Sequence, residues 1–375
     1  MIRAINRQVS SVRKNAMKQQ ESKAVTGVSP DNSPEGAGVQ VLEQCPVWWD
    51  EYPGKNRSFY QCSLWGQYLK ESKGCRTFYC YSESDGKIKG TLLAYLMPIE
   101  SPLAKIFKLN KLYWHQGPLL ADTADFDTAN ALLAALFNAA GGPLLVNGSS
   151  PYIDQKEVGE LYPGLSEKFK LKMNKWATFL VDLTGGDEKV WLNLLPDARR
   201  LVSRMRESGY EVRFIGRNDL ATYLDLLQRY RKSAGLAMPP FYPTNELLDQ
   251  LDDDAVLLPG VYIDDRLCAV SPVLFHGDTC TFFAAAQEPG LTGRERSVSY
   301  LLHWSIMEAA CRCKIKSYDL AGVAPAPATA KEEGIKRFKG KWGGRYLEYP
   351  VLDGGVGIMG RCLDILRLIF RKTIK

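Results

Sequence analysis

The sequence predicts an α+β protein built from two similar units with mixed sheets. The chain has 375 residues, a length that corresponds to about two domains. Strand-like and helix-like segments are interspersed along it, without the strict alternation of a parallel βαβ protein. Both halves also repeat one order of elements: a helix, a hairpin, a strand, a helix and a strand. We therefore expect two copies of one structural unit.

The first unit is expected to begin near residue 39. Aromatic and apolar residues recur at helical spacing over 59–72, which predicts a helix. Alternating segments flank a Ser-Asp-Gly turn over 77–99, which predicts a hairpin. The expected unit is completed by a strand over 111–120, a helix over 127–140 and a strand over 143–148.

The second unit is expected to begin with a strand over 176–183. Two helices follow over 187–194 and 196–209, and Gly209 is placed to end the second of them. The remaining expected elements are a strand over 211–215, helices over 219–235 and 244–251, three strands over 255–286, a helix over 297–313, strands over 316–322 and 338–350, and a helix over 358–375.

Positive charge is concentrated at the two ends of the chain. Residues 1–20 contain five cations and no acid, and residues 358–375 contain five cations against Asp364. Because the whole chain has a net charge of +6, the body between the ends is slightly acidic. This distribution argues against a protein that coats nucleic acid, but it leaves room for a local cationic groove.

The composition also sets the expected domain boundaries. Residues 1–38 are polar and end in a linker rich in Ser, Pro and Gly, so they are expected to be a disordered basic tail. We place the first domain at 39–172 and the second at 173–351.

The nine cysteines are scattered and odd in number, which does not fit a disulfide framework. This favours the reducing cytoplasm over an extracellular location. The three histidines lack zinc spacing, so no metal is expected. No apolar run reaches the ~18 residues of a membrane span, and the N-terminus lacks the apolar core of a secretory signal.

The segment 196–209 is a candidate anion-binding helix. Its apolar residues predict one buried face, and four arginines lie off that face with Glu207 as the acid beside them. Arg200 and Arg204 are one turn apart, so their guanidinium groups could hold one phosphate together. The alternative is a charged face covered by water.

The stretch 334–344 reads GIKRFKGKWGG and holds four cations without an acid. In a strand, alternation would point Arg337, Lys339 and Lys341 to one side and Phe338 to the other. Such a cationic face needs either water or a bound anion. The alternative is an edge strand whose lysines prevent pairing with another chain.

Five blocks of sequence, taken in order, resemble the Fem-type transferases, which are related to the GNAT acyltransferases and add amino acids to cell-wall precursors. The resemblance spans roughly residues 55–350. The blocks lie at 59–71, 113–120, 176–214, 282–310, and 318–323 together with 334–349.

The resemblance implies two tandem GNAT-like domains with mixed sheets and a site in the cleft between them. It also implies a C-terminal helix within 352–375 that packs back on the first domain. The reaction it implies is acyl transfer to an amine, with aminoacyl-tRNA as the usual donor and no cofactor besides that co-substrate. The acceptor would be an anionic, amine-bearing cell-wall or glycan precursor.

The family's Arg-Phe-Lys block lies by the reacting carbonyl, which implies catalytic roles for Phe338 and Lys339. A fixed cation there would stabilise the tetrahedral oxyanion formed when an amine attacks an ester. Arg337 opens the block and is expected to bind substrate. The other substrate-binding residues that the resemblance and the basic helix suggest are Lys70 (one residue away from the family's lysine), Arg199, Arg204 and Tyr242.

Three interpretations of the function stay open. The leading one is a cytoplasmic, monomeric aminoacyltransferase. The second is an enzyme that takes its acyl group from acyl-CoA or a carrier protein; the loop before 297–313 argues against it, because arginine and serine stand where close approach to a pyrophosphate needs glycine. The third is a non-catalytic protein that binds tRNA or a glycan. Asp319 and His303 are expected to be structural, at a strand end and in the core.

The last segment, 358–375, is predicted to be an amphipathic basic helix with two possible uses. It could dock on the first domain, or its basic side could rest on an anionic membrane. Docking is favoured, because its five apolar side chains need cover.

Overall fold

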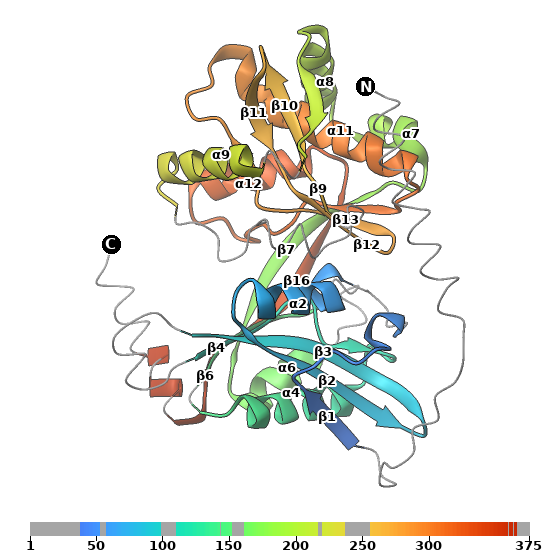
Figure 1. Ribbon diagram of the computed structural model, residues 1–375, viewed down its shortest axis with the longest axis vertical. Coiled ribbons are helices and arrows are strands. Elements are labelled where there is room, and N and C mark those ends of the chain that lie inside the picture. The colour runs from blue at the N-terminus through green and yellow to red at the C-terminus, as the bar shows by residue number, and fades with distance from the viewer. Residues whose placement is uncertain are drawn as a thin grey trace. The chain divides into compact units, whose positions relative to one another are not determined.

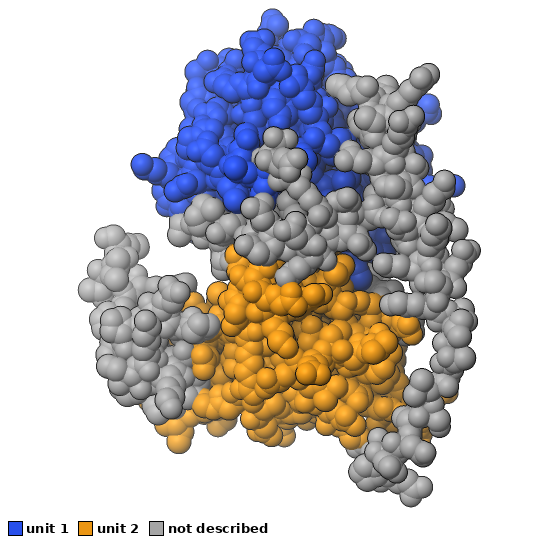
Figure 2. Space-filling model, in the orientation of Figure 1, with its two compact units in different colours: residues 1–29, 178–346 blue, residues 30–177, 347–375 orange. Residues whose placement is uncertain are grey.

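The computed structural model describes residues 38–52, 58–98, 110–142, 144–151, 161–216, 220–236, 256–358, 360–362 and 364–365. The chain divides into two compact units (Figure 2). Unit 1 contains Thr178–Tyr346, and unit 2 contains the chain before Thr178 from Pro30 onward together with the chain from Leu347. Strands β7 (Lys172–Asp182) and β16 (Arg345–Val356) each begin in one unit and end in the other.

Unit 2 is built on a sheet with the strand order β1-β2-β3-β4-β6-β16. Neighbouring strands pair antiparallel, except β4 and β6, which are parallel and are joined through helix α4 (Phe126–Ala140). The other bounds are β1 Gly38–Leu42, β2 Arg76–Ser84, β3 Lys87–Pro98, β4 Asn110–Trp114, β5 Leu119–Leu120 and β6 Leu144–Ser149. A mixed sheet was predicted for this unit, and it is confirmed.

Two helices cover the sheet of unit 2. Helix α4 lies on one face and helix α2 (Ser63–Glu71) on the other (Figure 1). The Asp125 carboxylate caps α4 by accepting from the Thr128 N–H at 2.9 Å. The apolar side of α4 packs against alternate residues of β2 and β3, among them Phe78 and Leu92, and this contact forms the core. Helix α6 (Leu161–Phe169), which was not predicted from the sequence, adds Tyr162 to this core.

The hairpin predicted over 77–99 is confirmed by β2 and β3. Asp85 and Gly86 connect the strands with φ values of 54° and 66°. Two consecutive positive φ values suit the twist of a two-residue hairpin loop, and Asp-Gly is a sequence that tolerates them. The turn therefore fixes the register of the longest strand pair in this unit.

Unit 1 contains two sheets. Their strand orders are β7-β15-β13-β12-β9 and β14-β11-β10-β8. Strands β13 (Thr279–Phe282) and β15 (Ser317–Asp319) are parallel and are joined through helix α11 (Val298–Arg312). The other elements are α7 Gly186–Asn193, α8 Pro196–Glu207, β8 Glu211–Phe214, α9 Leu220–Ser233, β9 Val256–Leu257, β10 Pro259–Ile263, β11 Arg266–Val270, β12 Val273–His276, β14 Ala286–Gln287, the 3-10 turn η4 Gly293–Ser297 and α12 Ala330–Gly340.

The strand predicted over 338–350 is wrong in its first part. Residues 330–340 form helix α12, and strand β16 begins only at Arg345. Thr329 and Glu332 form a capping box, in which each side chain accepts a hydrogen bond from the other's backbone N–H. Gly343 has a φ of 69°, and a Cβ there would collide with the Asn193 carbonyl oxygen, so the link between helix and strand needs glycine.

The start of the C-terminal segment packs on unit 2. The described residues between 357 and 365 are helical. Asp364 is 6% exposed, and its carboxylate pairs with the Lys172 ammonium at 3.0 Å. Gly360 lies so close to Gly355 and to the Leu144 carbonyl that a Cβ would not fit. The predicted packing of this segment on the first domain is therefore confirmed, while residues 366–375 lie outside the described ranges.

No helix in the described ranges has the length and apolar composition that crossing a bilayer requires. The tail 1–37 and the helix predicted over 244–251 lie outside those ranges, so their predictions stay predictions.

Cutting the chain after Val356 is expected to lower the melting temperature by at least about 3 °C, because the cut removes the buried partner of Lys172 and the close packing of Gly360. Thermal unfolding of the truncated and intact chains measures this. Arg361→Ala, at an exposed position of the same segment, should leave the melting temperature unchanged. An unchanged melting temperature after truncation, with salt-sensitive flotation of the intact chain on anionic liposomes, would favour membrane contact instead.

Candidate functional site

Lys339 lies in the last turn of α12 with 9% of its surface exposed. Its ammonium donates hydrogen bonds to the carbonyl oxygens of Ala321 and Gly322, each at 3.0 Å. Burial lowers the pKa of this ammonium to about 8, and the Asp319 carboxylate opposes that shift. The side chain therefore keeps most of its positive charge at neutral pH although protein covers it.

The turn that receives Lys339 follows strand β15. Asp319 is 1% exposed, and its Oδ1 accepts from the Ala321 N–H at 2.8 Å and from the Thr178 hydroxyl at 2.5 Å. Ala321 has a φ of 61°, in the left-handed region that is unfavourable for a residue with a Cβ. The bonds to Asp319 hold Ala321 in this conformation. Asp319, at the end of the strand, thus holds the backbone turn whose carbonyl oxygens bind Lys339.

This turn lies at the carboxyl end of a parallel strand pair. Strands β13 and β15 pair in parallel with Thr281 opposite Asp319. After β13, Ala284 also has a positive φ, 44°, and its carbonyl accepts from the Tyr223 hydroxyl at 2.9 Å. Ligands of open sheets bind beyond the carboxyl ends of parallel strands, and strained backbone is common at functional sites. Both features therefore mark this edge of unit 1 as the candidate site.

An aromatic cluster supports the Lys339 side of α12. His303 is 2% exposed, and its ring lies 5.3 Å from that of Phe338 and 5.1 Å from that of Trp342. Burial and the nearby Lys339 charge lower the pKa of His303 to about 3, so the imidazole is neutral. Its Nδ1 is hydrogen-bonded to the Tyr318 hydroxyl at 2.8 Å. Phe338 and His303 therefore position the helix that carries Lys339.

The other cations of 334–344 do not share a face with Lys339, contrary to the strand prediction. In the helix, Arg337 is exposed, and the Lys336 ammonium donates to the Pro325 carbonyl at 2.6 Å. The Lys341 ammonium pairs with Asp197 in the first turn of α8 and donates to the Tyr300 hydroxyl at 3.2 Å. A helix separates positions that a strand would align, and this explains the difference.

The arginines of α8 also differ from one another in their surroundings. Arg206 pairs with Glu308 of α11 at 2.5 Å, so Glu207 is not the sole acid near these arginines. Arg204 is exposed, and Arg199 lies 3.5 Å from the Leu192 carbonyl through Nη1. Arg199 and Arg204 therefore stay candidates for anion binding on a helix whose opposite face is buried.

Two predicted residues are not among those of unit 1 that the structure describes. Lys70 is exposed in the last turn of α2, in unit 2. Tyr242 lies outside the described residues. No sequence motif marks Thr178, which lies among apolar residues of β7. In the part of the chain that the structure describes, no group of three or more His, Cys, Asp and Glu side chains could hold a metal ion.

Residues 195–339 match the model of the acetyltransferase (GNAT) domain family. No curated protein matches the sequence. Among solved structures, the chain is similar to FemX, with a TM-score of 0.64 and 12% identity, over 83% of this chain and 96% of that one. It is also similar to a tandem GNAT protein from the clavulanic acid biosynthesis pathway, with a TM-score of 0.51 and 12% identity, over 82% and 92% of the two chains.

The predicted tandem GNAT-like fold is therefore confirmed. Lys339 is the last residue of the matched segment, which also contains β13, β15 and α11. The matched segment supports an acyltransferase, in a fold that this chain shares with FemX.

Proposed function

We propose that the protein transfers an aminoacyl group from aminoacyl-tRNA to an amine of an anionic cell-wall or glycan precursor. The observation that carries the proposal is the Lys339 ammonium, held by two backbone carbonyls at the carboxyl ends of β13 and β15. The Fem-type resemblance of the Arg-Phe-Lys block supports the choice of donor. A cytoplasmic location belongs to the same proposal.

In this reaction the neutral acceptor amine attacks the ester carbonyl of the donor. A carbon–nitrogen bond forms, the carbonyl oxygen becomes an oxyanion, and the carbon–oxygen bond to the tRNA ribose then breaks. The amine loses a proton and the ribose oxygen gains one. Lys339 would stabilise the oxyanion through an N–H not used for Ala321 and Gly322, since an ammonium has three donors. Its two carbonyl partners fix it before substrate arrives, so little reorganisation is needed.

Two alternatives differ from this proposal in testable ways. An acyl-CoA donor is disfavoured by the turn before α11. Close approach to a pyrophosphate needs glycines, and η4 has a single glycine, Gly293, followed by Arg294 and Arg296. A non-catalytic binding protein is disfavoured by the burial of Lys339, because a charge that only attracts an anion works best when exposed. The deciding experiment offers the protein charged tRNA pools and, separately, acyl-CoAs, and identifies acylated amines by mass spectrometry. Transfer from acyl-CoA alone would refute the proposed donor.

Lys339→Ala is expected to reduce single-turnover transfer by roughly 10²–10³, the effect of losing one oxyanion donor. Lys336→Ala is the matched control, because Lys336 lies on the same helix and also binds a loop carbonyl. The control should keep its transfer rate, and circular dichroism should show both variants folded. If the folded Lys339→Ala variant kept a nearly unchanged single-turnover rate, Lys339 would have no catalytic role.

The transfer rate is expected to fall as the pH rises through about 8, because the buried Lys339 ammonium loses its proton there. The acceptor amine titrates in the opposite sense, since it reacts in its neutral form, so the profile should be bell-shaped. Single-turnover rates between about pH 6 and pH 10 measure it. Lys339→Arg keeps its charge throughout this range, so the falling limb should be lost from whatever activity remains. If the transfer rate of this variant still falls at high pH, the titration of another group causes the fall.

Arg199→Ala and Arg204→Ala are expected to raise the acceptor KM about tenfold each, because each removes a charge-assisted hydrogen bond to the acceptor phosphate. The donor KM should not change. Lys232→Ala, at an exposed position of helix α9 in the same unit, separates a specific contact from a general loss of positive charge. An equal rise of the acceptor KM in all three variants would show that the arginines of α8 act only through their general positive charge.

A further inference from the structure

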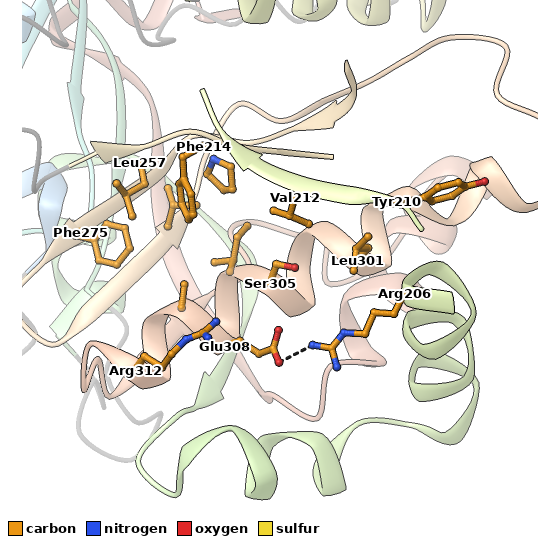
Figure 3. Close-up of a pocket in the computed structure, with 14 residues that line it drawn as sticks. Arg206, Tyr210, Val212, Phe214, Leu257, Phe275, Leu301, Ser305, Glu308 and Arg312 are labelled. Carbon is orange, nitrogen blue, oxygen red and sulfur yellow. Dashed lines mark hydrogen bonds and ion pairs between the residues drawn. The ribbon is translucent and has the colours of Figure 1, made fainter. Parts of the chain in front are cut away.

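A cavity of about 260 Å³ lies in unit 1 beside helix α11. Strands β8 and β12 line it with Phe214 and Phe275, whose rings project toward the helix, and Leu257 of β9 lies between them (Figure 3). Apolar cavities of about 150 Å³ bind benzene in proteins, so this one can hold a larger apolar group.

The space exists because two small residues of α11 face it. Ser305 and Ala309 are one helical turn apart, and both line the cavity. A side chain the size of leucine at position 309 would extend into the space between the helix and the strands. Cavities of this kind reduce the stability of a fold, so a ligand that fills it would stabilise the protein.

The mouth of the cavity is charged. Arg206, Glu308 and Arg312 line it, and Arg206 pairs with Glu308 at 2.5 Å (Figure 3). Two cations and one acid leave a net positive charge. A guanidinium has five N–H donors, so the ion pair with Glu308 does not use up those of Arg206. A ligand carboxylate could therefore bind Arg206 in addition to the Glu308 carboxylate.

We propose that this cavity is a binding site for a small amphipathic carboxylic acid, whose apolar body enters between α11 and the strands and whose carboxylate binds Arg206 and Arg312. The shape and the charge of the cavity both favour this class of ligand. Its apolar part would pack against the aromatic side chains, and its carboxylate would bind the arginines at the opening.

The site is separate from the Lys339 centre. Leu301, Ser305, Glu308 and Arg312 line the cavity from one face of α11. His303 contacts the Phe338 ring from the opposite face, since two residues turn a helix by about 200°. Binding can therefore be tested without any assumption about the acyl transfer.

The test is calorimetric titration of the full chain with octanoate, and with octanamide as a neutral ligand of the same shape. Octanoate is expected to bind, to raise the melting temperature, and to bind about tenfold more tightly than octanamide. Arg206→Ala and Arg312→Ala should each weaken octanoate binding about tenfold, whereas Glu308→Gln should strengthen it by removing the competing carboxylate. Ala309→Leu should abolish binding by filling the cavity.

Arg204→Ala is the control, because Arg204 lies on the same helix as Arg206 but does not line the cavity. It should bind octanoate as the unchanged protein does. The proposal is overturned if octanoate does not bind, if octanamide binds equally well, or if Arg206→Ala binds octanoate like the control. Arg206 and Arg312 are at exposed positions, so their variants decide the question even if Ala309→Leu fails to fold.

Discussion

A buried ammonium group needs hydrogen-bond acceptors, and this requirement at Lys339 organises the centre of unit 1. Taking the charge out of water is costly, and carbonyl oxygens of Ala321 and Gly322 replace part of the lost hydration. Those carbonyls are available only because Ala321 adopts a left-handed conformation that Asp319 stabilises. Helix α12 is thus joined to the turn after β15 through Lys339. The same turn is joined to strand β7 through the hydrogen bond between Asp319 and Thr178. A group held in this way is suited to stabilise negative charge that develops beside it.

The sequence predicted the fold well where local signals agree with tertiary structure. The Asp85-Gly86 turn and the alternating residues around it specify the hairpin, and apolar spacing specifies α8 and α11. The strand prediction failed at 338–340. Cations at every second position suggest a strand there, whereas the helix signal, the capping box at Thr329, lies nine residues earlier. The family resemblance suggested the catalytic role proposed for Lys339, but it gave no indication that the side chain is buried. The burial of Lys339 depends on the turn at 319–322, whose backbone carbonyls bind its side chain. No pattern in a single sequence predicts a contact between a side chain and the backbone of a distant turn.

The cations of unit 1 that look alike in sequence have different surroundings. Lys339 is buried against carbonyls, Lys341 joins α12 to the first turn of α8, and Arg206 joins α8 to α11. Helix α8 is thus anchored at both ends by ion pairs, one of which involves a residue next to the proposed catalytic helix. This arrangement leaves Arg199 and Arg204 on a fixed support. A rigid helix presents an anion-binding group more precisely than a loop does, because fewer conformations must be given up when the ligand binds.

The path of the chain has a consequence for how the protein is made. The part of strand β16 from Leu347 is synthesised after all of unit 1, yet it pairs with β6 in unit 2, with Val351 opposite Ser149. While a ribosome is still producing residues 161–340, β6 has β4 on one side and an open edge on the other. Open strand edges are sites of misassembly between chains. The nascent protein therefore passes through a long interval in which its first sheet is incomplete, and a chaperone that shields Leu144–Ser149 would help most during that interval.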